Sequence, residues 1–392
     1  MHLLVDPDSL SSVLKICNRI SDAKGFQPIY GYVKIEADED GVLSFSVLDS
    51  YVRFIGRAEA SEVKIPGIAV VETDRLVSIF KTRLGGHDTE LKIQDNFLEI
   101  KQGEFRARLP LYQRNEFPEF DLELVSSYSI EVTPSLLVNL SRCADAVDTK
   151  GLGNDSFQGL LIDFEDTNKL WICGFSNSLV HVYNTDVEEH GGFRCVLAPS
   201  CLPILSYFSA DVKTDIHFDL EHNKAVFQNP IISMSISFVE DKYPKDYVKL
   251  LGLKNMSKGE FCRSDNQELL KFIEMNTSDF LYALESASSV LGTEDKAIEF
   301  RREDKLDDGR GIVEMVGLNR MTQAKASEKI LVLDELDYKL TLGLHSEKVE
   351  STISKFQSEK FKFFVGDAQT PIIVVEEGVP DFVAVTLPLR VS

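Results

Sequence analysis

The hydrophobic residues of this chain follow a helical spacing in two places that begin alike. Apolar residues three and four apart predict a helix over residues 8–21 and another over 134–147. Pro7 and Pro134 stand at the starts of these helices, where the missing N–H of proline costs nothing. The two prolines are 127 residues apart (134 − 7), as are Lys15 and Arg142. This common offset indicates an internal repeat.

A second pair of markers repeats at nearly the same distance. Phe117-Pro118 and Tyr243-Pro244 each follow a strand-like segment, and their prolines are 126 residues apart (244 − 118). Proline ends a β-ladder because it has no N–H to donate. We therefore predict three repeated domains with boundaries at 1–126, 127–251 and 252–392. The third domain would begin with an additional stretch over 252–275.

The pattern within each repeat predicts an α+β domain with two helices and antiparallel sheets. Alternation of apolar and polar residues, as at Leu43, Phe45 and Val47, is typical of antiparallel strands that bury one face. One helix precedes the strands of each repeat and another lies midway through them. Helices are expected at 8–21, 73–84, 134–147, 200–209, 277–291 and 345–358, with a short one at 267–273. Expected strands include 63–71, 321–326 and 329–342.

Composition narrows the class of protein. The 392 residues include 42 Lys and Arg against 63 Asp and Glu, a formal charge of −21. Taken alone, this charge argues against nucleic-acid binding, because phosphate repels a negative surface. Net charge does not say how the charges are distributed, however. Six cysteines without a CxxC pair indicate reduced thiols of a cytosolic protein, and we expect neither a signal peptide nor a membrane span.

Sequence motifs of catalysis are missing or incomplete. Gly151-Leu152-Gly153 lacks the rest of a dinucleotide-binding fingerprint, and neither a Walker loop, GxSxG nor HExxH occurs. His217 and His222 flank Asp219, which leaves a metal site as a minor alternative to strand and turn residues. We therefore expect no enzyme and no cofactor, with an undetected active site as the remaining alternative.

Several motifs in order resemble one known family. They are the threefold repeat, the two aromatic-proline pairs, the segment Ser156-Phe157-Gln158-Gly159-Leu160-Leu161 and the terminal Pro388-Leu389-Arg390-Val391. Together they resemble the bacterial-type DNA polymerase sliding clamp, the β subunit or processivity factor, over essentially the whole chain. Residues 174–178 depart from the family's sequence, and this departure and the additional stretch at 252–275 would suit a phage-encoded member.

The resemblance implies both a fold and a function. Two subunits would join head to tail in a ring around double-stranded DNA and hold it topologically, without reading its sequence. The ring would tether the replicative polymerase, and the polymerase and the clamp loader would dock through short peptide motifs. Such a protein acts in the bacterial cytoplasm or nucleoid. The alternative is a clamp-fold scaffold that docks partner peptides without encircling DNA.

Basic residues on the expected helices and adjoining loops are the candidates to face DNA. A solvated helix face is the alternative for each of them, and the acidic Glu285 in the third repeat weakens the assignment there. The candidates are Lys15, Arg19, Lys24, Arg75, Lys81, Arg83, Arg142, Lys150, Lys348 and Lys355.

The resemblance also implies an apolar groove for partner peptides between the middle and last domains. Ordinary core positions are the alternative interpretation. The residues carried over are Phe157, Gly174, Ser176, Asn177, Leu179, Pro244, Leu250, Val385, Leu387, Pro388, Leu389 and Arg390. Of the family's run over 174–179, this chain keeps only the final leucine.

The last implied site is the seam between subunits. Phe105, Ala107 and Leu109 alternate with arginines, so one face of that strand is apolar. In the family this edge strand joins the third domain of the other subunit, where Val290 and Leu291 would pack on Phe105. The alternative is a sheet edge covered by its own domain.

Overall fold

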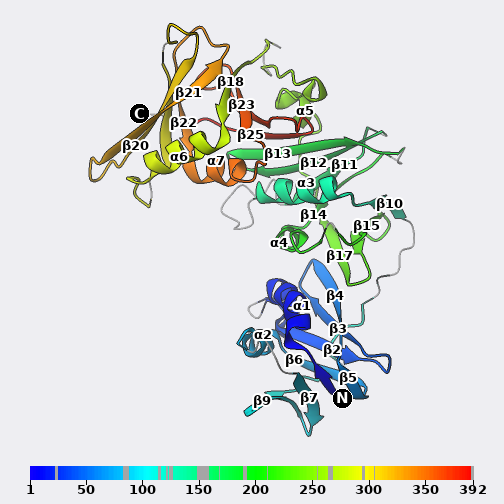
Figure 1. Cartoon of the computed structure of the whole chain (residues 1–392). Coiled ribbons are helices and arrows are strands. Elements are labelled where there is room, and N and C mark those ends of the chain that lie inside the picture. Colours follow the sequence, from blue (N-terminus) through cyan, green and yellow to red (C-terminus); the bar gives the residue numbers. More distant parts are fainter. Residues whose placement is uncertain are drawn as a thin grey trace. The chain divides into compact units, whose positions relative to one another are not determined.

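Figure 1 shows the computed structural model of the chain. It divides into two compact units, Met1–Ser141 with Cys195–Glu240 and Arg142–Arg194 with Asp241–Ser392. The structure describes residues 1–22, 25–82, 88–113, 116–120, 122, 127–147, 159–166, 168–188, 192–209, 211–253, 255–263, 268–293, 296–303 and 305–389.

Helix α1 (Pro7–Ile20) shows how the sequence sets a helix of the first unit. The Asp6 side chain caps its N-terminus by accepting the backbone N–H of Asp8 at 3.0 Å. Leu10, Val13 and Cys17 lie on the buried face, so the polar face of the helix remains exposed. Helix α2 (Thr73–Lys81) contacts α1, and together they form a two-helix layer.

Two antiparallel sheets complete the first unit. The smaller has the order β5 (Glu62–Ile65), β1 (His2–Val5), β7 (Thr89–Gln94), β8 (Phe97–Gln102) and β9 (Phe105–Pro110). The larger runs through β6 (Gly67–Glu72), β2 (Tyr32–Ala37), β3 (Val42–Leu48), β4 (Val52–Glu59), β17 (Ile232–Val239), β16 (Lys224–Gln228), β15 (Asp215–Asp219) and β10 (Ser127–Glu131). Val196 and Leu197 of β14 (Arg194–Leu197) also pair with β17.

The second unit is built on one continuous set of paired strands. Their order is β11 (Leu160–Asp163), β12 (Lys169–Ser176), β13 (Leu179–Asp186), β25 (Phe382–Thr386), β24 (Ile372–Glu376), β23 (Lys360–Val365), β18 (Lys271–Asn276), β21 (Lys325–Asp334), β20 (Gly311–Leu318), β19 (Ala297–Arg302) and β22 (Leu340–His345). The helices of this unit include α5 (Tyr247–Leu250), α6 (Thr277–Ser288) and α7 (Ser346–Ile353). The end of α3 (Pro134–Asp145) also belongs to it.

The same order of elements occurs three times along the chain. A short strand (β1, β10 or β18) leads into a helix (α1, α3 or α6), and then come three strands. After one further strand, or two in the first repeat (β5 and β6), comes a second helix (α2, α4 (Leu202–Leu205) or α7), and then three last strands. The sequence pattern did not predict the three leading strands.

Repeats are joined by main-chain pairing of equivalent strands. Within the first unit β4 pairs antiparallel with β17, from Val52↔Ile236 to Gly56↔Ile232. Within the second unit β13 pairs antiparallel with β25, from Leu179↔Thr386 to Tyr183↔Phe382. In both cases the third strand after the first helix of one repeat joins the last strand of the next.

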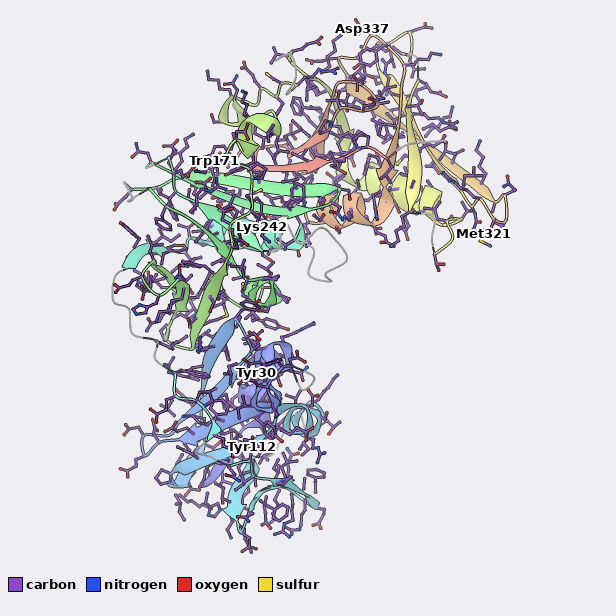
Figure 2. All side chains as sticks on the ribbon, turned by 180° about the vertical axis from the view of Figure 1, so that it is seen from behind. Tyr30, Tyr112, Trp171, Lys242, Met321 and Asp337 are labelled. Carbon is purple, nitrogen blue, oxygen red and sulfur yellow. The ribbon has the colours of Figure 1, made fainter. Side chains whose placement is uncertain are left out.

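Both aromatic-proline markers are buried anchors. Phe117 is buried with Ile29, Leu48 and Val70, and Tyr112 packs against this cluster (Figure 2). Tyr243 is buried in the second unit, where its hydroxyl donates to the Gly159 carbonyl at 2.8 Å. An aromatic ring therefore fixes the chain just before each proline turns it.

The structure corrects several predicted elements. Residues 271–273 are not helical but begin β18, whose Ile273 and Met275 are buried at period two. The strand expected over 63–71 is interrupted between β5 and β6, because Pro66 cannot continue the ladder. Of the helix expected over 200–209, the structure has a 3₁₀ turn at Pro199–Cys201 and the short α4.

The third repeat differs from its predicted strands for an identifiable reason. Residues 319–324 form a turn, and β21 begins only at Lys325. Over 329–342 the chain forms two strands, because the Arg302 guanidinium binds the Asp334 carboxylate and donates to the Leu336 and Tyr338 carbonyls. These bonds occupy backbone carbonyls that a continuous ladder would need.

Two further predictions concern reduced thiols and membrane spans. All six cysteines are free thiols, and burial raises the pKa of Cys17, Cys173 and Cys201. Such thiols react slowly because the thiolate is the nucleophile. Across the described residues, every helix is too short or too polar to traverse a bilayer.

Candidate functional site

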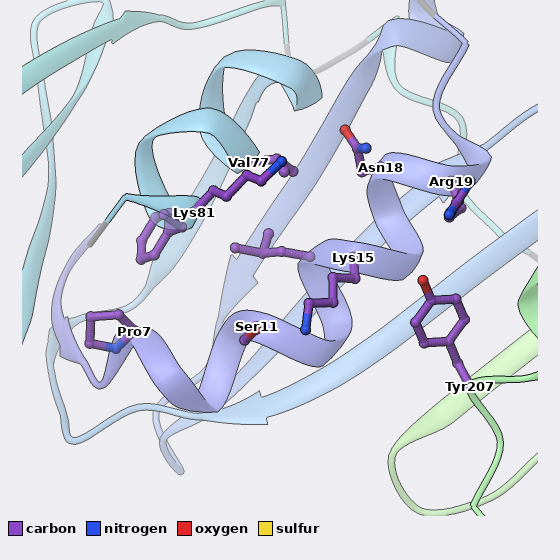
Figure 3. A pocket seen from close by; sticks show the side chains of 10 residues that line it. Pro7, Ser11, Lys15, Asn18, Arg19, Val77, Lys81 and Tyr207 are labelled. Atoms are coloured by element: carbon purple, nitrogen blue, oxygen red, sulfur yellow. The ribbon is translucent and has the colours of Figure 1, made fainter. Parts of the chain in front are cut away.

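Three of the predicted DNA-facing cations gather on one face of α1 and α2. Lys15 and Arg19 are exposed on α1, and Lys81 is exposed at the end of α2. All three line a cavity of about 310 Å³ (Figure 3). The buried stripes of α1 and α2 leave these positions facing solvent.

The same cavity contains residues that the sequence did not single out. Ser11 and Asn18 come from α1, and Tyr207 comes from the turn that follows α4. Tyr207 points its ring toward the α1 face in Figure 3. No sequence signal identified Tyr207, because it reaches the cavity from a segment nearly two hundred residues from α1.

Arg75 is exposed on α2 and does not line this cavity. Its Nε lies 2.7 Å from a carboxylate oxygen of Glu72, three residues earlier. An exposed pair of this kind contributes little stability. Arg75 therefore already has an anionic partner, and its charge lies outside the cavity.

The prediction that Arg142 faces DNA is wrong. Arg142 is buried, and its Nη1 lies 3.0 Å from an oxygen of Glu376, which is 1% exposed. Nη2 donates to the Lys355 carbonyl at 2.8 Å. A buried carboxylate needs a buried cation beside it, so this side chain has a structural task that its equivalence to Lys15 did not reveal.

A buried histidine lies next to this ion pair. His181 Nδ1 donates to the Arg142 carbonyl at 2.6 Å, and its Nε2 is 3.0 Å from the Thr352 hydroxyl. The carbonyl can only accept, so Nδ1 carries the proton of the neutral ring. Burial lowers the pKa of His181 to about 4. Neutral imidazole is therefore the form that this packing requires.

The two lysines expected to face DNA near α7 both have partners. Lys348 donates to the hydroxyls of Ser176 and Ser178, at 3.2 and 2.8 Å. Lys355 is exposed but pairs with Asp145. Lys355 thus has an anionic partner, and the ammonium group of Lys348 is held by two hydroxyls. Lys24, Arg83, Lys150, Phe157 and Arg390 lie outside the described residues.

The C-terminal part of the predicted groove is assembled around the β12–β13 turn. The backbone N–H of Leu387 donates to the Ser178 carbonyl at 3.0 Å, and that of Leu389 donates to Gly343 at 2.9 Å. Leu387 and Asn177 are exposed, whereas Pro388 and Leu389 are half-buried. These residues form an accessible, partly apolar surface.

Other predicted groove residues have a packing role instead. Leu179 and Val385 are buried in the β13–β25 ladder, and Ser176 is buried with its hydroxyl donating to Leu179. A Cβ on Gly174 would lie 1.8 Å from the Cys143 carbonyl oxygen. Only glycine lets β12 approach the end of α3 this closely, so we remove Gly174 from the groove.

Pro244 and Leu250 are exposed around the buried α5 anchor. The Tyr247 hydroxyl donates to the Asp163 carboxylate at 3.2 Å, tying α5 to β11. Burial raises the pKa of Asp163, and the nearby Arg194 opposes that shift. Arg194 also lies 3.1 Å from Asp241, so a compact charged cluster supports the segment that holds Pro244.

The predicted seam residues lie at strand edges and helix ends. Strand β9 is the last strand of its sheet, with Phe105 and Ala107 half-buried and Leu109 buried. Val290 and Leu291 are partly exposed just after α6. Beyond its pairing with β20, β21 pairs with β18 only at Leu333 and Asp334.

No protein-family model matches the chain. The chain is 21% identical over 302 residues to the Beta sliding clamp of Helicobacter pylori, covering 74% of this chain and 77% of that protein. Its fold matches solved structures over 100% of both chains. The DNA polymerase III beta subunit of Thermotoga maritima has a TM-score of 0.81 at 14% identity. The Helicobacter pylori beta clamp bound to a DNA ligase peptide has a TM-score of 0.78 at 18% identity. The predicted α+β clamp fold is confirmed.

Proposed function

We propose that this chain, which has the fold of bacterial β sliding clamps, is a DNA sliding clamp and not an enzyme. It forms a ring that encircles duplex DNA and tethers the replicative polymerase for processive synthesis. The observation that carries the proposal is a match to clamp structures over the whole length of the chain. The Helicobacter pylori relative reported above is likewise a Beta sliding clamp. We place the protein in the bacterial cytoplasm.

The joints between repeats support a head-to-tail homodimer of three-domain subunits, divided at 126 and 251. Pairing of β4 with β17 and of β13 with β25 joins each repeat to the next. By the same rule β21 of the third repeat needs the last strand of a first repeat, which is β9. A second copy supplies that strand, and two such joints close the ring.

Side chains on these two strands suit each other. Arg106 is exposed on β9, and Glu328 lies on β21. If β21 and β9 pair with the same register as the strands of the other two joints, the first half of β21 lies against residues 105–109 of a second copy. Opposite charges across an antiparallel pair are favourable and also fix the register.

The net charge of −21 is compatible with DNA in the hole of the ring. Lys15, Arg19 and Lys81 gather on the two-helix layer of the first unit. A ring that repels phosphate outside and attracts it at this layer favours threaded DNA over DNA on its rim. Because the ring is closed, weak contacts suffice to retain DNA and do not stop it from sliding.

We also propose that partner peptides of the polymerase and the clamp loader dock beside the C-terminal strand. Exposed Leu387 and the half-buried Pro388 and Leu389 are the apolar contacts. A clamp structure with the same fold has a bound DNA ligase peptide, which supports peptide docking on this fold. Replacing Leu387 with Asp should abolish capture of a clamp-binding peptide without changing the dimer mass.

Retention on circular DNA tests encirclement. The dimer is dissociated, reassembled with nicked circular DNA, and washed at high salt. A clamp remains on the circle and leaves when a restriction enzyme linearises it. Equal loss from circular and linear DNA would favour the second candidate, a scaffold of clamp fold that docks peptides only. The burial of Arg142 and the partnered lysines near α7 are the observations that favour that candidate.

A further inference from the structure

The exposed cations of the helices are distributed unevenly between the repeats. Lys15, Arg19 and Lys81 make no ion pair with any other residue that the structure describes. In the third repeat, α6 has no basic residue and carries Asp279 and Glu285. α7 and the turn after it carry the partnered Lys348 and Lys355.

In the second repeat, the cation of α3 is the buried Arg142, and α4 has the sequence Leu-Pro-Ile-Leu. Positive charge available to a ligand therefore concentrates on α1 and α2. An evenly lined ring would hold DNA by the same weak attraction everywhere, whereas the residues that the structure describes provide one dominant position in each subunit.

The cavity between α1 and α2 gives this position a definite shape. Leu14 and Phe80 are buried beneath it, and the partly exposed Val77 completes its apolar floor. The rim carries Lys15, Arg19 and Lys81, together with the polar groups of Ser11, Asn18 and Tyr207 (Figure 3).

The combination of groups indicates the chemistry of the ligand. Lysine and arginine are the usual partners of phosphate oxygens, and hydroxyl and amide groups add directed hydrogen bonds. An apolar floor accommodates the carbon atoms of a sugar. The ligand is thus an anion with an attached apolar ring, as in a nucleic-acid backbone.

We propose that this cavity is a sugar-phosphate subsite for the duplex backbone, and that it is the principal DNA contact of each subunit. Lys15 and Lys81 neutralise the phosphate, and the Tyr207 hydroxyl donates to one of its oxygens. The inference rests on the proposed clamp function. It adds that DNA is held toward the first repeat of each subunit, and it makes Tyr207 and Asn18 DNA contacts.

Binding of a short linear duplex to the dimer tests the subsite, with fluorescence anisotropy as the readout over a series of salt concentrations. The Lys15→Ala/Lys81→Ala dimer should bind about tenfold more weakly at low salt, because it loses two phosphate contacts. Each lost contact should also reduce the slope of log K against log salt concentration by about 0.9. Tyr207→Phe should weaken binding by about twofold to threefold with an unchanged slope, because its lost hydrogen bond releases no counterion.

Two variants serve as matched controls. Arg75→Ala removes a cation from the same helix outside the cavity, and Lys355→Ala removes an exposed, partnered cation from the third repeat. Both should bind within about twofold of the parent, because their charges are already compensated. The substituted lysines and Arg75 are exposed and Tyr207 is half-buried, so dimer mass and far-UV circular dichroism should be unchanged.

The outcomes separate the subsite from the clamp function. If the parent stays on nicked circles but Lys355→Ala weakens duplex binding as much as Lys15→Ala/Lys81→Ala, the subsite proposal is overturned and encirclement stands. Loss of the parent from circles overturns encirclement itself. Displacement of the duplex by millimolar thymidine monophosphate in the parent, but not in Lys15→Ala/Lys81→Ala, would support the cavity as a sugar-phosphate subsite.

Discussion

Replacing Arg142 with methionine should strongly destabilise the second unit. The substitution keeps much of the apolar stem but leaves the Glu376 carboxylate, 1% exposed, without its cation at 3.0 Å. Removing one partner of a buried ion pair typically costs about 3–5 kcal/mol of unfolding free energy. The lost hydrogen bond to the Lys355 carbonyl belongs to the same cost. We therefore expect a loss of about 4 kcal/mol.

A second substitution should restore much of this stability. Glu376 Oε1 accepts the backbone N–H groups of Gln357 and Ser358, at 2.6 and 3.0 Å. Glu376→Gln keeps an oxygen for these two donors and removes the charge. The double variant should therefore be more stable than Arg142→Met alone, with a coupling energy of about 2 kcal/mol.

Urea unfolding followed by fluorescence provides the measurement. Trp171 is the one tryptophan of the chain and lies on β12, so its emission reports the second unit (Figure 2). With a slope of about 2.5 kcal/mol per molar urea, a loss of about 4 kcal/mol lowers the midpoint by about 1.5 M. A midpoint change below about 0.4 M for Arg142→Met, or simple additivity in the double variant, would refute the buried-pair reasoning.

Other substitutions test the histidine, the close backbone contact and the seam. Because the folded pKa of His181, about 4, lies below the unfolded value of about 6.5, only the unfolded state takes up a proton between these pH values. Stability should therefore fall by about 1 kcal/mol from pH 7 to pH 5.5, and His181→Gln should reduce that fall; an unchanged pH dependence would contradict the assignment. Gly174→Ala should lower the free energy of unfolding by about 3 kcal/mol or more, because the added Cβ meets the Cys143 carbonyl oxygen. A variant with the thermal stability of the wild type would disprove the close contact. Glu328→Arg should shift the dimer toward monomer in sedimentation, and Arg106→Glu in the same chain should partly restore it; a dimer insensitive to both would exclude β9–β21 pairing as the seam.

The sequence alone was sufficient for the long helices and for the repeat. The apolar spacing of α1, together with Pro7, predicted a helix within one residue of each of its ends. Simple alternation at Leu43, Phe45 and Val47 likewise predicted the strand that forms β3. These signals are local, because a residue's face on a helix or strand follows from its own spacing. Short elements such as β1, β10 and β18 have too few residues to show a period.

The candidate site was only partly predictable for a related reason. Exposure of Lys15 and Lys81 follows from helical periodicity, which the sequence contains. Whether a cation has a partner depends on segments distant in sequence, and Arg142 with Glu376 is the clearest case. Tyr207 shows the converse, since it joins the α1–α2 cavity only through folding.

The sequence by itself determined that the chain repeats three times, that its helices and strands alternate in an α+β order, and that one face of α1 is polar. Only the tertiary structure decided that repeats join through β4–β17 and β13–β25, and which of the basic residues present their charge to solvent. The physical reason is that spacing along a chain fixes the direction of a side chain relative to its own element. Its burial and electrostatic partner are fixed by whichever element packs against it.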